Sequence, residues 1–152
     1  MIAKILNAIT LSRIFCAILI YLILFLESNY SLALFLFIVA SFSDFLDGYL
    51  ARKTDSVSVL GEILDPIADK LLIVFVLIGL SINLDSFLIG FISAIIISRE
   101  IWVAALRDIN SRNNESDKTK VTFLAKTKTA IQMLSILMYL FGLTINNMMV
   151  LF

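Results

Sequence analysis

Long apolar runs separated by short polar stretches make up most of the chain. A helix rises about 1.5 Å per residue, so it needs about 20 residues to cross the roughly 30 Å hydrocarbon core of a bilayer. Five runs approach this length, at residues 9–26, 31–50, 64–82, 87–106 and 123–143. The pattern predicts an all-α, polytopic transmembrane helical bundle of five spans, with an interfacial N-terminal segment ahead of the first.

The composition supports a membrane protein. Hydrophobic residues make up 61% of the 152 positions and charged residues 16%. A soluble domain of this size would expose far too much apolar surface. The N-terminus lacks a signal-peptide cleavage site, so the first run is expected to remain as an anchor. We therefore expect a single membrane domain over residues 1–152, with membrane lipids around it and no nucleic-acid partner.

The basic residues predict the orientation. If the spans alternate in direction, all 12 Lys and Arg residues lie on one side of the membrane. The turns at residues 27–30 and 83–86, on the other side, contain none. Basic connections stay in the cytoplasm by the positive-inside rule. The sequence thus predicts a cytoplasmic side that carries nearly all of the polar chemistry.

Four aspartates lie on this side, where the second and third runs meet. Asp44 and Asp47 are near the end of one run, and Asp65 and Asp69 are near the start of the next. Spacings of three and four place each pair on one helix face. Carboxylates gathered in a low dielectric repel one another unless cations lie between them. With no His in the chain, the set suits two divalent ions of a phosphoryl-transfer site; solvated helix caps are the alternative.

The order Asp-x2-Asp-Gly-x2-Ala-Arg-x8-Gly-x3-Asp-x3-Asp, starting at Asp44, resembles the motif of the CDP-alcohol phosphotransferase family at every position. The resemblance implies a phosphatidyl transfer from a CDP-activated lipid to an alcohol, with release of CMP. It implies that Asp44, Asp47 and Asp65 bind two Mg²⁺ or Mn²⁺ ions, and that Asp69 is the general base and a further ligand. Family members have six spans, so the eight residues after Thr144 are expected to be a stub of the sixth, in a chain that is truncated or does not need that helix.

The resemblance also implies a nucleotide-binding surface on the first three spans. Gly48 and Ala51 would leave room for CDP against the helix, and Arg52 would pair with its phosphate. Gly61 would allow close approach at the turn. An Asn-x2-Thr-x2-Arg segment near the N-terminus is similar to one found in many family members. Its Asn and Thr would donate hydrogen bonds to the polar head of the substrate. The positions implied for CDP binding are Asn7, Thr10, Gly48, Ala51, Arg52 and Gly61.

Basic residues at membrane depth are candidates for binding the phosphate of an acceptor, because an intramembrane cation normally faces the bundle interior. Glu100 is about 100° from Arg99 on the helix, so we do not expect it simply to neutralise Arg99. Lys128 shares a face with Gln132, whereas the lysine two residues earlier points elsewhere and could reach lipid phosphates. For Arg13, an interfacial snorkelling role is the alternative. The acceptor-phosphate candidates are Arg13, Arg99, Arg107, Lys126 and Lys128.

Other pieces of the chain resemble the bacterial phosphatidylglycerophosphate synthase branch of the family, among them Ser-Arg99-Glu-Ile and Lys126-x-Lys-Thr-x2-Gln132. That branch implies CDP-diacylglycerol as donor, sn-glycerol 3-phosphate as acceptor and phosphatidylglycerol phosphate as product. It also implies a bacterial inner membrane, with the active site facing the cytoplasm, and the family is commonly dimeric. Sister enzymes that use serine, inositol phosphate or phosphatidylglycerol are the alternatives.

Two other classes of protein also place aspartates in membrane helices. A cation transporter would have them near the bilayer midplane, on helices broken by Gly or Pro in paired halves. Here they cluster at the cytoplasmic ends, and the chain has no internal repeat. A non-catalytic membrane scaffold would need neither the four aspartates nor the motif glycines. The sequence therefore favours the enzyme.

Overall fold

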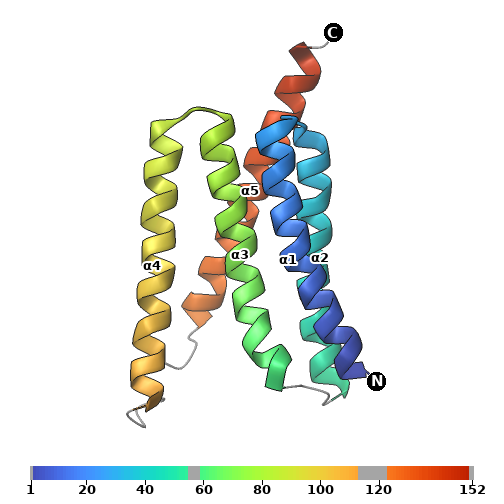
Figure 1. Ribbon diagram of the computed structural model, residues 1–152, viewed down its shortest axis with the longest axis vertical. Coiled ribbons are helices and arrows are strands. Elements are labelled where there is room, and N and C mark those ends of the chain that lie inside the picture. The colour runs from blue at the N-terminus through green and yellow to red at the C-terminus, as the bar shows by residue number, and fades with distance from the viewer. Residues whose placement is uncertain (1, 55–58, 113–122, 151–152) are drawn as a thin grey trace.

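The apolar runs form five helices in the computed structural model, which describes residues 2–54, 59–112 and 123–150. Side chains are described for these residues except 2–6, 44–54, 59–60, 62–63, 107–108, 110–112, 123–126, 148 and 150. The helices are α1 (Ile2–Leu26), α2 (Tyr30–Thr54), α3 (Val59–Asn83), α4 (Phe87–Arg112) and α5 (Phe123–Val150) (Figure 1). The prediction of an all-α bundle is confirmed.

Helix ends extend beyond the predicted runs. α2 continues through the aspartate motif to Thr54, and α3 begins at Val59, before its predicted start. Gly61 therefore lies in the first turn of α3 and not in the connection, and Pro66 is inside the helix. Residues 144–150 continue α5 and do not start a further helix. The difference arises because hydropathy marks membrane depth, whereas a helix continues through polar residues as long as its backbone hydrogen bonds are satisfied.

Neighbouring helices alternate in direction, so one end of the bundle collects the N-termini of α1, α3 and α5 and the C-termini of α2 and α4 (Figure 1). At the opposite end, short turns join α1 to α2 and α3 to α4. Ser28 and Asp85 in these turns have positive φ values of 52° and 45°, a left-handed conformation found in tight connections. As a result, α1 and α3 run in the same direction side by side.

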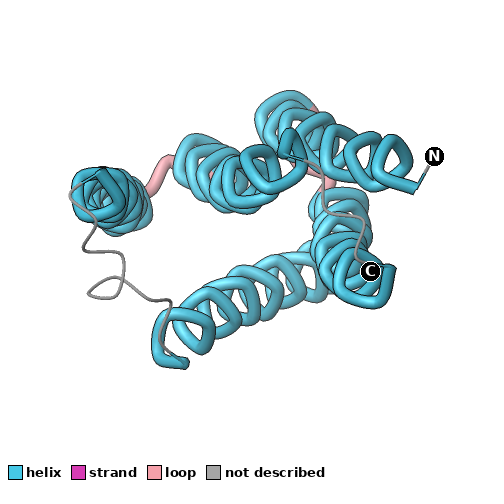
Figure 2. The backbone as a smooth tube through the Cα atoms, turned by 90° about the horizontal axis from the view of Figure 1, so that it is seen from below, coloured by secondary structure: helices cyan, strands magenta, loops and turns pink. Residues whose placement is uncertain are grey.

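The core lies between α1, α2 and α3, with α5 packed obliquely across α2 (Figure 2). Alanines on α1 and α2 are buried in it and let the helices approach closely. α4 packs on α3 at the edge of the bundle; among its described side chains Ser93 is buried, and most apolar ones are exposed. The buried cluster consists of Ala17, Ile20, Leu24, Ala33, Phe37, Ala40, Leu72, Ile73, Val76, Leu80, Ile136 and Leu140.

Asn83 ties three helices together at the end opposite the aspartates. Its side-chain Nδ2 donates hydrogen bonds to the carbonyl oxygen of Leu24 at 2.6 Å and to Ser28 Oγ at 2.7 Å, and the hydroxyl of Tyr30 donates to its Oδ1 at 2.6 Å. The Leu24 carbonyl belongs to the last turn of α1, whose carbonyls lack intrahelical partners. The amide thus fixes the α1–α2 turn against the end of α3.

Three described stretches are long and apolar enough to span a bilayer, namely Asn7–Leu26 in α1, Phe87–Leu106 in α4 and Thr127–Asn147 in α5. α2 contributes a shorter apolar stretch, Tyr30–Ser43. The side chains of α2 are described only as far as Ser43, and α2 and α3 each carry aspartates of the motif at one end. Both nevertheless pack beside α1 along their length (Figure 1).

Gly79 allows the close approach of α1 and α3. A Cβ atom at this position would lie 3.1 Å from Leu24 Cδ1 and 3.5 Å from the Cα of Tyr21. We expect Gly79→Val to destabilise the fold by about 1–3 kcal/mol, since overpacking forces neighbours to shift. Thermal unfolding of the purified protein in detergent measures the effect.

The matched control is Gly142→Val on α5, where an added Cβ meets no atom within 4 Å. This variant should unfold at close to the wild-type temperature. Equal shifts for the two variants would contradict the assignment of Gly79 to a close helix–helix contact.

Candidate active site

Two polar side chains of α1 bind two carboxylates of α3 at the end of the bundle where both helices begin. Thr10 Oγ1 donates a hydrogen bond to Asp65 Oδ1 at 2.8 Å, and an Arg13 guanidinium nitrogen donates to Asp69 Oδ1 at 2.8 Å. The pairs meet because α1 and α3 run in the same direction, so a spacing of three on one helix matches a spacing of four on the other. The paired residues are 55 and 56 positions apart in sequence. Together Thr10, Arg13, Asp65 and Asp69 form a polar contact between α1 and α3, called the polar seam below.

Arg13 is the largest fully buried side chain described, with 0% of it exposed, whereas 29% of the Asp69 side chain is exposed. A buried guanidinium requires an anionic partner because its desolvation is costly. We expected Arg13 to bind the phosphate of an acceptor; in the structure it holds Asp69, and it is not part of the lining of the pocket described next. Its direct effect is to orient the Asp69 carboxylate.

A polar pocket of about 230 Å³ opens between α3, α4 and α5 beside Asp69. Its cations are Lys70 from α3, Arg99 from α4 and Lys128 from α5, and its carboxylates are Asp69 and Glu100. The lining therefore carries three positive and two negative formal charges. Its remaining members are Pro66, Ile73, Val103, Thr129 and Gln132. Three of the predicted site residues, on three different helices, face this one space.

Glu100 joins α4 to α5 across this pocket. Its Oε1 accepts from Arg99 NH1 at 3.2 Å and forms an ion pair with Lys128 Nζ. Our expectation that Glu100 does not simply neutralise Arg99 was therefore incomplete, because two long side chains can curl around the helix and meet despite their angular separation. Glu100 holds both cations at one point, and no pattern in the sequence indicated its partner on α5.

Of the other predicted site residues, two have side chains that the structure describes and the rest do not. Asn7 and Gly61 are half-buried on α1 and α3, next to the seam. The side chains of the remaining predicted site residues lie outside the description, although their backbones belong to the last turns of α2 and α4 and the first turn of α5. No group of three potential metal ligands occurs among the side chains that are described. The undescribed members are Asp44, Asp47, Gly48, Ala51, Arg52, Arg107 and Lys126.

Comparison with known proteins identifies the family to which this arrangement belongs. The profile of the CDP-alcohol phosphatidyltransferase family matches residues 4–152, nearly the whole chain. The chain belongs to this family. The family resemblance predicted from the aspartate motif is thereby confirmed. Together with the three apolar helices, membership identifies this CDP-alcohol phosphatidyltransferase family protein as an integral membrane protein.

Three curated relatives of this family member carry the name CDP-diacylglycerol–glycerol-3-phosphate 3-phosphatidyltransferase. The Haemophilus influenzae protein is 38% identical over 111 residues, which is 73% of this chain and 60% of the relative. The Wigglesworthia glossinidia brevipalpis protein is 40% identical over 101 residues, 66% of this chain and 56% of the relative. The Rickettsia bellii protein is 38% identical over 138 residues, 90% of this chain and 74% of the relative. The match thus spans about three fifths of the first two relatives.

The buried Arg13–Asp69 pair predicts a large asymmetry between two arginines of this family member. Arg13→Leu leaves a carboxylate without its guanidinium, and we expect a loss of about 1–3 kcal/mol in unfolding free energy, below the usual cost of breaking a fully buried pair because Asp69 is partly exposed. Arg99→Leu, whose side chain is 53% exposed in the wild type, should cost clearly less. Thermal unfolding in detergent compares them, and similar losses would argue against a structural role for the pair.

The Glu100 bridge predicts a charge-swap rescue. Glu100→Lys replaces the carboxylate between Arg99 and Lys128 by a further cation and should lower the unfolding free energy by about 1 kcal/mol. Adding Lys128→Glu restores opposite charges across α4 and α5 and should recover most of the loss. Glu27→Lys, in the exposed α1–α2 turn, is the control and should have little effect. Failure of the double variant to recover stability would show that the bridge does not hold the two helices.

Proposed function

We propose that the chain transfers a phosphatidyl group from CDP-diacylglycerol to the hydroxyl of sn-glycerol 3-phosphate, forming phosphatidylglycerol phosphate and releasing CMP. The observation that carries this proposal is the position of Asp69, which lies on the wall of a cationic pocket and at the end of a four-aspartate motif. The names of the relatives support the same reaction.

The cationic pocket fits an acceptor that carries its own phosphate. Arg99 and Lys128 converge on Glu100 from two helices, and an ammonium and a guanidinium together have more donors than one carboxylate can accept. A phosphate dianion can therefore bind the remaining donors. Serine lacks this group, so the pocket favours a phosphorylated alcohol over it. Arg107 and Lys126 extend the proposed basic zone on the same two helices. Arg13 lies outside the pocket lining, and its charge offsets that of Asp69.

The carboxylates of the motif suit a divalent metal. Asp65 and Asp69 point from one face of α3 toward α1, and we propose that they bind two Mg²⁺ or Mn²⁺ ions together with Asp44 and Asp47. Oxygen ligands without thiolate or imidazole are those that these cations prefer. Bound there, the metal would neutralise the pyrophosphate charge of the donor. The proposed nucleotide surface comprises Asn7, Thr10, Gly48, Ala51, Arg52 and Gly61.

Asp69 is the proposed general base. It would take the proton of the acceptor hydroxyl while the hydroxyl oxygen bonds to the phosphorus that carries diacylglycerol. The bond from that phosphorus to the bridging oxygen breaks, and the oxygen leaves with CMP. A carboxylate has about four lone-pair sites, so Asp69 can accept from Arg13 and still approach the acceptor. The Arg13 contact would keep the carboxylate aligned for this transfer.

The orientation follows from the charges. The aspartates and the cationic pocket lie at the end of the bundle where the basic residues collect, and the positive-inside rule places that end in the cytoplasm. We therefore propose a bacterial inner-membrane enzyme that meets its two water-soluble ligands, glycerol 3-phosphate and CMP, on the cytoplasmic side.

CMP release by the purified protein in detergent, with CDP-diacylglycerol and Mg²⁺, tests this function. Glycerol 3-phosphate, serine, inositol phosphate and phosphatidylglycerol are supplied one at a time. We expect release with glycerol 3-phosphate and its loss in EDTA. Asp69→Asn, which keeps an oxygen that can accept from Arg13, should reduce the rate by about 10²–10⁴-fold, the usual contribution of a general base.

Each result bears on one part of the proposal. CMP release only with another acceptor would show that glycerol 3-phosphate is not the substrate. Activity in EDTA would show that the reaction does not require a divalent metal. Full activity of a correctly folded Asp69→Asn protein would overturn the general base.

A further inference from the structure

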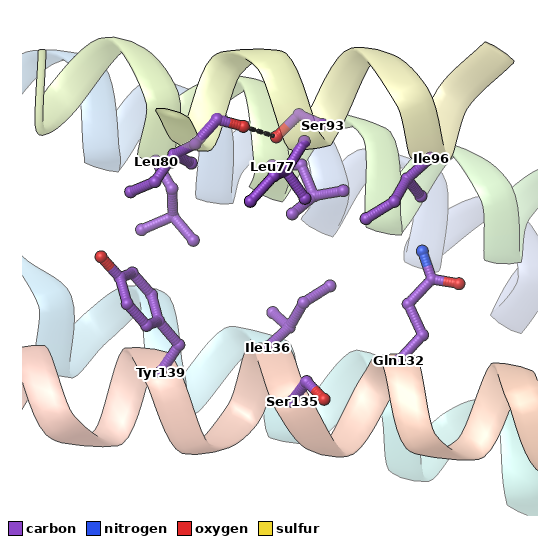
Figure 3. A pocket seen from close by; sticks show the side chains of 10 residues that line it. Leu77, Leu80, Ser93, Ile96, Gln132, Ser135, Ile136 and Tyr139 are labelled. Atoms are coloured by element: carbon purple, nitrogen blue, oxygen red, sulfur yellow. Dashed lines mark hydrogen bonds between the residues drawn. The ribbon is translucent and has the colours of Figure 1, made fainter. Parts of the chain in front are cut away.

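A second, apolar cavity of about 360 Å³ lies between α3, α4 and α5 (Figure 3). Its lining residues lie further along the three helices from the aspartate end than those of the polar pocket. Leu77 and Leu80 from α3, Ile96 from α4 and Ile136 from α5 face the apolar cavity. The cavity is only partly enclosed. Its α4 wall runs from Ile89 to Ile96, about 10 Å of helix, within a stretch long and apolar enough to span the bilayer.

The two serines of this cavity do not make it polar. Ser93 Oγ donates to the carbonyl oxygen of Ile89 at 2.6 Å, and Ser135 Oγ donates to that of Ile131 at 2.8 Å. Both hydroxyl protons are therefore used within their own helices. A stable water needs two to four polar partners, which these two serines alone do not supply. A hydrocarbon is the suitable occupant of this space.

Two further members of the lining are polar: Tyr139 brings a phenol hydroxyl, and Gln132, two turns earlier on α5, brings an amide. Its Nε2 is buried and has no hydrogen-bond partner among the described residues, and the amide projects from α5 toward Ile96 on α4 (Figure 3). A buried donor without a partner is costly at membrane depth. An acceptor oxygen brought by a ligand would satisfy it.

Gln132 also lines the polar pocket, so it stands where the two spaces adjoin. Lys128 lies one turn, or about 6 Å, nearer the cytoplasm on the same face of α5. From the cytoplasm inward, the protein thus presents cations, then one amide donor, then an apolar cavity. A phospholipid has the complementary order of phosphate, ester carbonyl and acyl chain.

We propose that this cavity binds one acyl chain of the lipid donor, with the Gln132 amide donating to the ester carbonyl of that chain. The proposal rests on the proposed function, because the phosphate end of the same lipid must reach the aspartate motif. A packed helix, from this chain or a second copy, fits the amide less well, since helix carbonyls are already bonded within the helix. A lipid ester carries an acceptor that has no such bond.

Filling the cavity tests the site. Ser93→Phe and Ser135→Phe each add a ring to the cavity wall, and kcat/KM is measured with dioleoyl and with dihexanoyl CDP-diacylglycerol at saturating glycerol 3-phosphate. We expect a loss of about tenfold or more with the long-chain donor and less than about twofold with the short-chain donor. Ile95→Phe and Leu134→Phe are matched controls on the same helices, at positions 54% and 59% exposed, and should leave both values unchanged.

The amide is tested by removing either partner of the proposed hydrogen bond. Gln132→Leu should raise the KM for CDP-diacylglycerol about 3–10-fold and leave the KM for glycerol 3-phosphate within about twofold. An ether-linked donor lacks the ester carbonyl, so the wild type should lose affinity for it and the substitution should add no further loss, as in a double-mutant cycle. Independent, multiplying losses would overturn the hydrogen bond.

Photolabelling tests occupancy without turnover or substitution. A CDP-diacylglycerol with a diazirine near the carbonyl end of the chain is bound to the wild-type protein and cross-linked, and the labelled peptides are identified by mass spectrometry. Label within residues 89–96 and 132–139 is expected. Label confined to the outer face of α4, such as Trp102, which is 69% exposed, would overturn the site.

These results separate the inference from the function on which it rests. If the wild-type protein releases CMP with neither donor, the proposed function is wrong. Photolabelling then still shows whether the cavity binds an acyl chain. A wild-type protein active with both donors, with filling variants that do not change the chain-length preference, overturns the cavity alone. If those variants change the oligomeric state but not the chain-length preference, the cavity is an interface with a second copy of the chain, and the acyl-chain proposal is wrong.

Discussion

The structure depends on the pairing of charged groups in a medium that cannot solvate them. A guanidinium buried among helices is tolerated only with an anionic partner, and Arg13 finds it in Asp69. This contact and the neighbouring Thr10–Asp65 bond fix the rotation and the height of α1 against α3 at one end. Asn83 fixes the same two helices at the other end, and the missing side chain of Gly79 lets them approach between these points. The packed centre of the bundle is therefore built around a polar seam.

α4 and α5 are held differently from this centre. Each packs mainly on one neighbour, α4 on α3 and α5 on α2, and Glu100 links them across the polar pocket. One wall of the polar pocket is α3, which belongs to the tightly packed centre and carries Asp69. The other two walls are α4 and α5, which the Glu100–Lys128 ion pair joins. Groups that must be aligned for chemistry lie on the rigid part, whereas cations that must receive a ligand lie on the more loosely attached helices.

Polarity changes along the same three helices from one end to the middle of the membrane. The polar pocket is lined by Asp69, Arg99 and Lys128. The apolar cavity is lined by Leu77, Ile96 and Ile136, and Gln132 borders both spaces. Each step follows from helical spacing, since Gln132 and Ile136 are one and two turns beyond Lys128. One face of α5 therefore carries a graded series of contacts suited to an amphipathic ligand.

The sequence by itself determined the helical class, the aspartate motif and the collection of basic residues at one end of the helices, because apolar run length and spacing along one helix depend on local geometry alone. The shared face of Lys128 and Gln132 was also predictable, for the same reason. The sequence could not determine that Arg13 holds Asp69 or that Glu100 reaches Lys128. Nor could it show that Nε2 of Gln132 is buried with no hydrogen-bond partner in the described part of the chain. Those contacts join residues on different helices, and they depend on how each helix is rotated, shifted and inclined against its neighbours. Apolar faces that point to lipid and to protein look alike in a membrane sequence, so only the tertiary structure decides which side chains meet.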